Sequence, residues 1–133
     1  MGRFDGRGAI VTGGALGIGG GCARRIAADG GSVLIVDVNE SAGANTVKEI
    51  RAAGGKAEFM AGDVSKQSTA EEMVESAVSS FGRLDLLVQN AYAGADNAGS
   101  AVEVEPDNWH SGMDLLVGAL YLGAKNAVPA MEE

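Results

Sequence analysis

A glycine-rich stretch near the amino end is the first place where residue types and spacing indicate chemistry. Thr12–Gly19 reads T-G-G-A-L-G-I-G and lies between a short apolar run and a helical pattern over Cys22–Ala28. Gly13, Gly17 and Gly19 leave three positions of this stretch without a side chain. A phosphate binds to backbone N–H groups at a helix N-terminus, where a Cβ atom would obstruct it. The spacing therefore predicts a pyrophosphate site, with an ordinary strand-to-helix turn as the alternative.

A carboxylate follows the next apolar run. Asp37 comes directly after Val33–Val36, a continuous β-branched run typical of a strand that is covered on both faces. A carboxylate at the end of such a strand can accept hydrogen bonds from the hydroxyls of a ribose, and it would repel a phosphate on the same sugar. The alternative interpretation of Asp37 is a turn residue or a helix cap.

The composition limits the kinds of partner. The 133 residues make one domain at most, and 46% of them are hydrophobic. Eighteen acidic and 10 basic side chains give a net charge of −8, which argues against nucleic acid or an anionic membrane as partner. The single cysteine cannot form an internal disulfide, and no run approaches the ~18 apolar residues of a membrane span. With no signal peptide apparent at the N-terminus, we expect a cytoplasmic protein.

Apolar runs alternate with helical patterns along the chain. The expected strands are 8–11, 33–36, 57–61 and 84–88, and the expected helices are 18–29, 41–53, 67–81 and about 106 to about 130, with a loop over 91–101. This alternation predicts βαβ units and a Rossmann-like, doubly wound α/β fold with a parallel sheet in the order 3-2-1-4. A ligand crevice then lies at the carboxyl ends of strands 1 and 4, where the winding reverses.

The glycine stretch resembles a known family. Thr12, Gly13, Gly17, Ile18 and Gly19 match the T-G-x-x-x-G-[IL]-G of the short-chain dehydrogenases/reductases. The resemblance implies hydride transfer between a nicotinamide cofactor and a small alcohol or carbonyl substrate.

Two further segments extend this resemblance. It implies that Asp63 and Val64 contact the adenine ring, and that Asn90 and Ala91 belong to the family's L-V-N-N-A-G segment. The NADP-binding members usually place Arg or Lys in the glycine loop or after the second strand, where this chain has Leu16, Val38 and Asn39. We therefore predict NAD as the cofactor. The predicted cofactor-binding residues are Gly13, Leu16, Gly17, Ile18, Gly19, Asp37, Val38, Asp63, Val64, Asn90 and Ala91.

The chain also departs from the family pattern. Tyr92 stands at the glycine of L-V-N-N-A-G, and Leu116 stands where members carry an Asn that holds a water. The family's catalytic Ser and Tyr-x-x-x-Lys belong to a fifth strand and helix, so we expect residues 1–133 to be a single NAD-binding domain that stops before the fifth strand. Tyr121 and Lys125 have Y-x-x-x-K spacing, but they lie in the fourth-helix segment, where we interpret Tyr121 as a core or interface residue and Lys125 as a surface residue.

No catalytic residue and no metal ligand is therefore assigned. The only histidine, His110, is interpreted as a surface side chain, and the three carboxylates of Asp96, Glu103 and Glu105 as part of a solvated loop. Because the fourth and fifth helices of the family pack between subunits, we expect a homo-oligomer. A non-catalytic dinucleotide-binding or assembly module is the alternative function.

Overall fold

The computed structural model describes residues 2–92 and 99–133, which form one parallel sheet with helices on both faces. The four strands are β1 (Gly8–Thr12), β2 (Ser32–Asp37), β3 (Lys56–Ala61) and β4 (Leu86–Gln89). Their order in the sheet is β3-β2-β1-β4, and Ile10 in β1 is paired with Leu34 in β2 and Leu87 in β4. The predicted α/β fold and strand order are confirmed.

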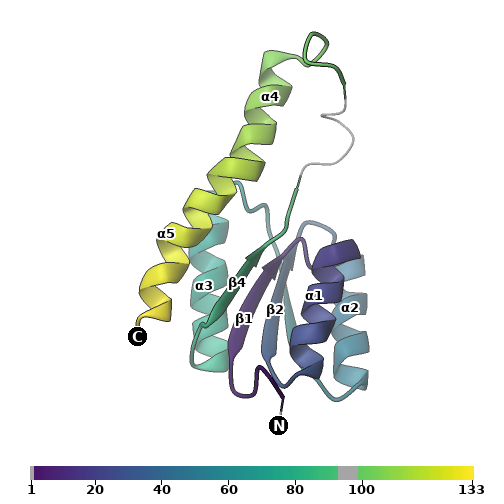
Figure 1. The fold of residues 1–133 in the computed structure, drawn as a ribbon, viewed down its shortest axis with the longest axis vertical. Coiled ribbons are helices and arrows are strands. Elements are labelled where there is room, and N and C mark those ends of the chain that lie inside the picture. The colour runs from purple at the N-terminus through teal and green to yellow at the C-terminus, as the bar shows by residue number, and fades with distance from the viewer. Residues whose placement is uncertain (1, 93–98) are drawn as a thin grey trace.

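The helices divide between the two faces of this sheet (Figure 1). They are α1 (Gly17–Ala28), α2 (Glu40–Ala52), α3 (Gln67–Phe81), α4 (Pro106–Met113), the π-helical η2 (Asp114–Gly118) and α5 (Ala119–Met131). Helices α1 and α2 cover one face, while α3 and α5 cover the other (Figure 1). Right-handed crossovers from one parallel strand to the next place the helices in this way.

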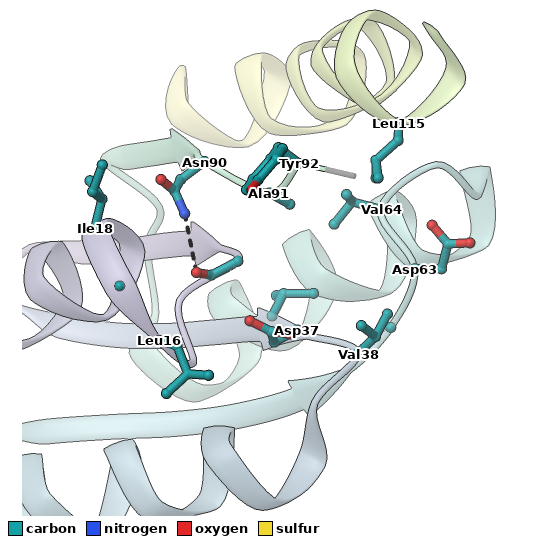
Figure 2. A pocket seen from close by; sticks show the side chains of 14 residues that line it. Leu16, Ile18, Asp37, Val38, Asp63, Val64, Asn90, Ala91, Tyr92 and Leu115 are labelled. Carbon is teal, nitrogen blue, oxygen red and sulfur yellow. Dashed lines mark hydrogen bonds between the residues drawn. The ribbon is translucent and has the colours of Figure 1, made fainter. Parts of the chain in front are cut away.

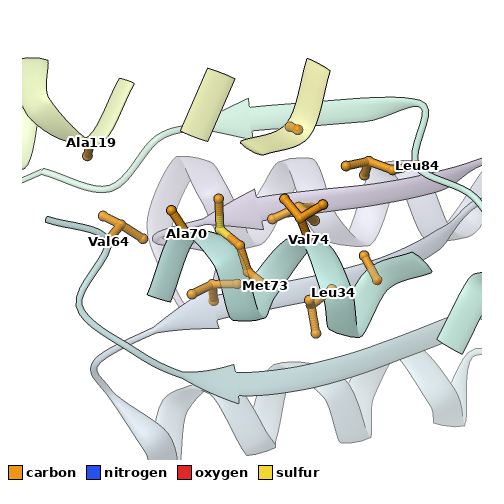
Figure 3. Packing of buried hydrophobic residues seen from close by; sticks show 11 residues of the cluster. Leu34, Val64, Ala70, Met73, Val74, Leu84 and Ala119 are labelled. Atoms are coloured by element: carbon orange, nitrogen blue, oxygen red, sulfur yellow. The ribbon is translucent and has the colours of Figure 1, made fainter. Parts of the chain in front are cut away.

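Alternate residues of the strands build two separate cores. Ile10 and Leu34 pack with Met73 of α3, in the cluster that Figure 3 shows. Val11 and Ile35, their neighbours along the strands, pack toward α1 and α2 on the other face. Because successive side chains of a strand point to opposite faces, a strand covered on both sides must be apolar throughout.

Helix α3 has the predicted bounds, whereas the other elements differ from the sequence prediction by one residue at one or both ends, and β4 differs by two at its start. Helix α1 begins at Gly17, one residue earlier than expected. Strand β4 covers Leu86–Gln89 instead of 84–88, because its pairing with β1 begins at Leu86, and Leu84 is buried in the α3 core ahead of the strand. The predicted long helix is present over 106–131, but η2 interrupts its α-helical hydrogen bonding. Residues 93–98 of the expected loop, including Asp96, lie outside the described residues.

The long helix keeps an apolar surface. Neither α4 nor η2 buries a residue, and their exposed side chains include Trp109, Leu116 and Val117. Within the described residues, no helix combines the length and the apolar character needed to cross a membrane.

Candidate functional site

A crevice of about 540 Å³ opens at the carboxyl ends of the strands (Figure 2). It lies where β1 and β4 are neighbours in the sheet and the chain winding reverses, which is the usual ligand position in open α/β sheets. Its lining residues are Gly13, Leu16, Gly17, Ile18, Val36, Asp37, Val38, Gly62, Asp63, Val64, Asn90, Ala91, Tyr92 and Leu115. The structure therefore brings together every predicted site residue except Gly19.

The N-terminus of α1 faces this crevice through Gly17. The residue has a φ of +56°, which favours glycine, and a Cβ built on it meets no atom within 4 Å. The first helical hydrogen bond runs from the Gly20 N–H to the Leu16 carbonyl oxygen. The N–H groups of 17–19 precede that bond, so the helix itself offers them no acceptor, and the helix dipole adds partial positive charge there.

At the other two glycines of the motif, a side chain would collide with the protein itself. A Cβ on Gly19 would overlap the Gly13 carbonyl oxygen and the side-chain amide of Asn90, and a Cβ on Gly13 would come within 2.8 Å of Ala91 Cα. Their small size therefore allows the glycine turn to pack against the segment after β4. Of the three, Gly17 alone has open space where a side chain would be.

Thr12 fixes this packing, and the sequence analysis did not assign it a role. Its Oγ1 accepts hydrogen bonds from the N–H groups of Asn90 (3.1 Å) and Ala91 (3.3 Å). The side-chain amide of Asn90 in turn donates to the Gly13 carbonyl oxygen at 3.1 Å. The threonine is in the T-G motif, so the sequence contained a signal for it.

Asp37 lies on the side of the crevice formed by β2. Its Oδ2 accepts a hydrogen bond from the Ala15 N–H at 3.1 Å, and its Oδ1 accepts one from the Asn39 N–H at 3.0 Å. The carboxylate thus holds the glycine turn and the start of α2 together. Each oxygen keeps a second lone pair, and the side chain lines the crevice, so Asp37 can also accept a hydrogen bond from a bound hydroxyl.

A buried threonine supports the glycine turn from behind. The Thr46 hydroxyl donates to the Ala15 carbonyl oxygen at 2.7 Å and accepts from the Arg24 guanidinium at 3.3 Å. Arg24 also forms an ion pair with Glu49 at 2.7 Å. Sequence reasoning missed Thr46, because no local pattern indicates a contact between α2 and a turn 31 residues earlier.

Asp63 and Val64 follow β3 and form a third side of the crevice. Burial raises the pKa of Asp63, but hydrogen bonds from the hydroxyl and N–H of Ser65, with the charge of Lys66, outweigh it and lower the pKa overall. Both hydrogen bonds reach Oδ1, at 2.7 and 2.9 Å. Val64 is buried and belongs to the α3 core. An ionised carboxylate therefore stands beside an apolar wall.

Four residues outside the predicted set complete the lining: Val36, Gly62, Tyr92 and Leu115. Tyr92 and Leu115 lie on the same side of the crevice as Asn90, opposite Leu16 and Asp37 (Figure 2). Leu115 comes from η2, whose position the sequence did not predict.

The Tyr121 and Lys125 pair lies outside the crevice. Tyr121 is 63% exposed, which excludes the core residue and leaves the interface residue as the prediction, and Lys125 is exposed as predicted. The Lys125 ammonium lies 5.8 Å from the centre of the Tyr121 ring. Neither residue lines the crevice.

Comparisons with known proteins identify the class of this chain. The family pattern described as short chain dehydrogenase matches residues 7–133. The chain is 40% identical over 115 residues to a 3beta-hydroxysteroid dehydrogenase of Mediterraneibacter gnavus, covering 86% of this chain and 41% of that protein. It is 42% identical over 96 residues to a diacetyl reductase [(S)-acetoin forming] of Staphylococcus epidermidis, covering 72% and 37%.

A solved structure agrees with these relatives. A short chain dehydrogenase/reductase from Burkholderia phymatum, crystallised in complex with NAD, superimposes with a TM-score of 0.91 at 32% identity, covering 98% of this chain and 46% of that one. The chain belongs to the short-chain dehydrogenase/reductase family of oxidoreductases. It spans about two fifths of the length of the curated relatives that it matches.

Proposed function

We propose that residues 1–133 form one NAD-binding domain, which supplies the cofactor-binding part of an oxidoreductase. The bound nicotinamide would give or take a hydride at the carbon of a small alcohol or carbonyl substrate. The observation that carries the proposal is that the α1 N-terminus and the Asp37 carboxylate line one crevice. Relatives named as a dehydrogenase and a reductase, and a similar structure in complex with NAD, support it.

The donors and acceptors of the crevice fit an adenine dinucleotide. The diphosphate would lie at the N–H groups of Gly17 and Ile18, where no Cβ intervenes and the dipole favours negative charge. Asp37 would accept hydrogen bonds from the adenosine ribose. Asp63 Oδ2 and the Val64 backbone would contact the adenine ring, with the Val64 side chain against its face.

The charges at the ribose favour NAD over NADP. Among the described residues that line the crevice there is no Lys or Arg, while Asp37 and Asp63 contribute negative charge. A 2′-phosphate on the ribose would meet the Asp37 carboxylate without a compensating cation. Repulsion between like charges at short distance therefore disfavours NADP.

The test is a titration with NADH and NADPH, followed by cofactor fluorescence. We expect NADH to bind more tightly, and Asp37→Ala to weaken NADH binding about tenfold, since a hydrogen bond to a charged group contributes about 1.5–3 kcal/mol. Glu40→Ala is the control, because it removes the same charge at the exposed start of α2, outside the crevice lining. Unchanged NADH affinity in Asp37→Ala would contradict the assignment.

A non-catalytic dinucleotide-binding module is the second candidate, and Leu116 favours it. This side chain is 45% exposed and apolar, so it cannot hold a water at the position where the family has an Asn. Reduction of NAD with a panel of alcohols separates the two functions. Turnover supports the oxidoreductase and excludes the module.

We also propose that copies of the chain associate through the long helix, and that the protein is cytoplasmic. Helices α4 and α5 with η2 expose Trp109, Leu116, Leu120 and Tyr121 along 106–131. Such a row of large apolar side chains is typical of a protein interface. Light scattering over a range of concentrations tests the association, and a monomer at all concentrations would contradict it.

A further inference from the structure

Tyr92 is an unusual member of the crevice lining. Its side chain is 73% exposed, although it borders both the crevice and an adjoining cavity of about 240 Å³. Its backbone is held by neighbours whose N–H groups donate to the buried Thr12 hydroxyl. The ring therefore stands at the mouth of the crevice on a fixed base.

The position of Tyr92 relative to the other lining groups decides which part of a ligand it meets. Asp37 and Leu16 lie along one side of the crevice, and Tyr92 and Leu115 lie along the other (Figure 2). Gly17 lines the crevice as the first residue of α1. A dinucleotide with its ribose at Asp37 and its diphosphate at Gly17 must extend its second nucleotide toward the β4 side.

The chemistry of that side suits a flat ring. Ala91 and Leu115 are apolar, and the side-chain amide of Asn90 already donates to Gly13. Tyr92 carries the only aromatic ring among the described residues that line the crevice. Aromatic rings attract one another in offset-stacked or edge-to-face arrangements, and the face of a phenol attracts a cationic ring such as the pyridinium of NAD⁺.

We propose that Tyr92 packs against the nicotinamide ring and gives the crevice its affinity for that half of the cofactor. The inference rests on the proposed function, because it requires the adenosine half to bind at Asp37. The role belongs to the ring face, so it does not need the phenolic hydroxyl.

The test compares NAD⁺ with ADP-ribose, which lacks the nicotinamide ring, by titration calorimetry. In Tyr92→Ala we expect NAD⁺ to bind about five- to tenfold more weakly and ADP-ribose to change less than about twofold. Tyr92→Phe should bind both ligands like the unmodified protein. Tyr121→Ala is the matched control, because it removes another exposed tyrosine, which lies outside the crevice.

Several results would overturn the inference. Equal weakening of NAD⁺ and ADP-ribose in Tyr92→Ala would assign Tyr92 to the shape of the loop, and unchanged NAD⁺ affinity would remove it from the site. A loss of NAD⁺ affinity in Tyr92→Phe would transfer the role to the hydroxyl. If the unmodified protein binds neither ligand, the proposed function fails together with the inference. If ADP-ribose binds and Tyr92→Ala has no selective effect, the inference alone fails. Thermal denaturation of each variant checks that the fold is retained.

Discussion

Strands β1 and β2 and helix α1 differ sharply in burial from β4 and from the helical segment that follows it. All five residues of β1 and four of the six in β2 are buried, whereas none of the four in β4 is fully buried. Helix α1 buries five residues, while α4 and η2 bury none. Within the N-terminal part, residues 8–81, the strands β1 and β2 are therefore covered on both faces, while the edge strand β3 buries only Ala57. The C-terminal part, residues 84–92 and 99–131, keeps apolar surface for further contacts.

This difference separates two tasks within one chain. The N-terminal part supplies the glycine turn, Asp37 and Asp63, which are the groups that we propose bind the diphosphate and the adenosine. The C-terminal part supplies Tyr92 and Leu115, on the side of the crevice that we assign to the nicotinamide. The better-buried N-terminal part thus holds the adenosine half of the proposed cofactor, and the more exposed C-terminal part borders the nicotinamide half.

The largest effect on stability is expected from truncating a buried leucine of the N-terminal part, and an exposed leucine of the C-terminal part serves as the comparison. Leu34 is 2% exposed and Leu120 is 47% exposed. Leu34→Ala should lower the free energy of unfolding by about 2–5 kcal/mol, because it removes buried methyl groups and leaves a cavity. Leu120→Ala should change it by less than about 0.5 kcal/mol in the monomer, as is usual for surface positions. Urea denaturation measures both, and equal losses would contradict the contrast.

The sequence predicted this division only in part. A continuous apolar run such as Val33–Val36 indicates from local sequence alone a strand that is covered on both faces. The alternation of such runs with helical patterns predicted the strand order, and the helical pattern over 67–81 predicted the bounds of α3. The close approach of Gly19 to Asn90 and the contact of Thr46 with Ala15 depend on chain segments far apart in sequence. The π-helical turn at 114–118 likewise carries no local signal.

The next largest effect on stability is expected from removing the hydrogen bond between Thr46 and the glycine turn. Thr46→Val keeps the shape of the side chain but leaves the Ala15 carbonyl oxygen without its 2.7 Å hydrogen bond, so we expect a loss of about 1–3 kcal/mol. NADH affinity should fall as well, because Ala15 precedes the helix end that faces the crevice. Thr46→Ser retains the hydroxyl and should restore affinity in the same titration. Equal affinity in all three proteins would exclude a role for this contact in binding.

Alanine substitutions at two glycines separate an effect on stability from an effect on NADH binding. Gly17 and Gly54 both have positive φ, +56° and +85°, and a Cβ on either meets no atom within 4 Å. Alanine at each should cost about 1–2 kcal/mol of stability through backbone strain. The loss of NADH affinity is expected in Gly17→Ala alone, because only Gly17 lines the crevice. If Gly54→Ala weakens binding as much, strain and not obstruction is the cause.

The smallest effect on stability is expected at Asp85, which connects the two parts through hydrogen bonds from Arg7 and from the Gly8 N–H. Hydrogen bonds from Arg83 lower the pKa of Asp85 far below its usual value, and bonds from the Gly8 N–H and Arg7 add to this against the effect of burial. A lowered pKa in the folded state gives stability that is present above about pH 4 and is lost as the pH falls below it.

Asp85→Asn should therefore be less stable than the unmodified protein at pH 7, by about 1 kcal/mol or less, and the difference should shrink on acidification. Denaturation at pH 7 and pH 3 measures it. A stability difference that is independent of pH would show that the charge of Asp85 does not stabilise the junction.

A crystal structure with NAD tests the central claim most directly. We predict the diphosphate at the N–H groups of Gly17 and Ile18, the adenosine ribose at the Asp37 carboxylate, and the nicotinamide on the Tyr92 side. An empty crevice at saturating NAD, or a dinucleotide bound elsewhere on the chain, would contradict the account.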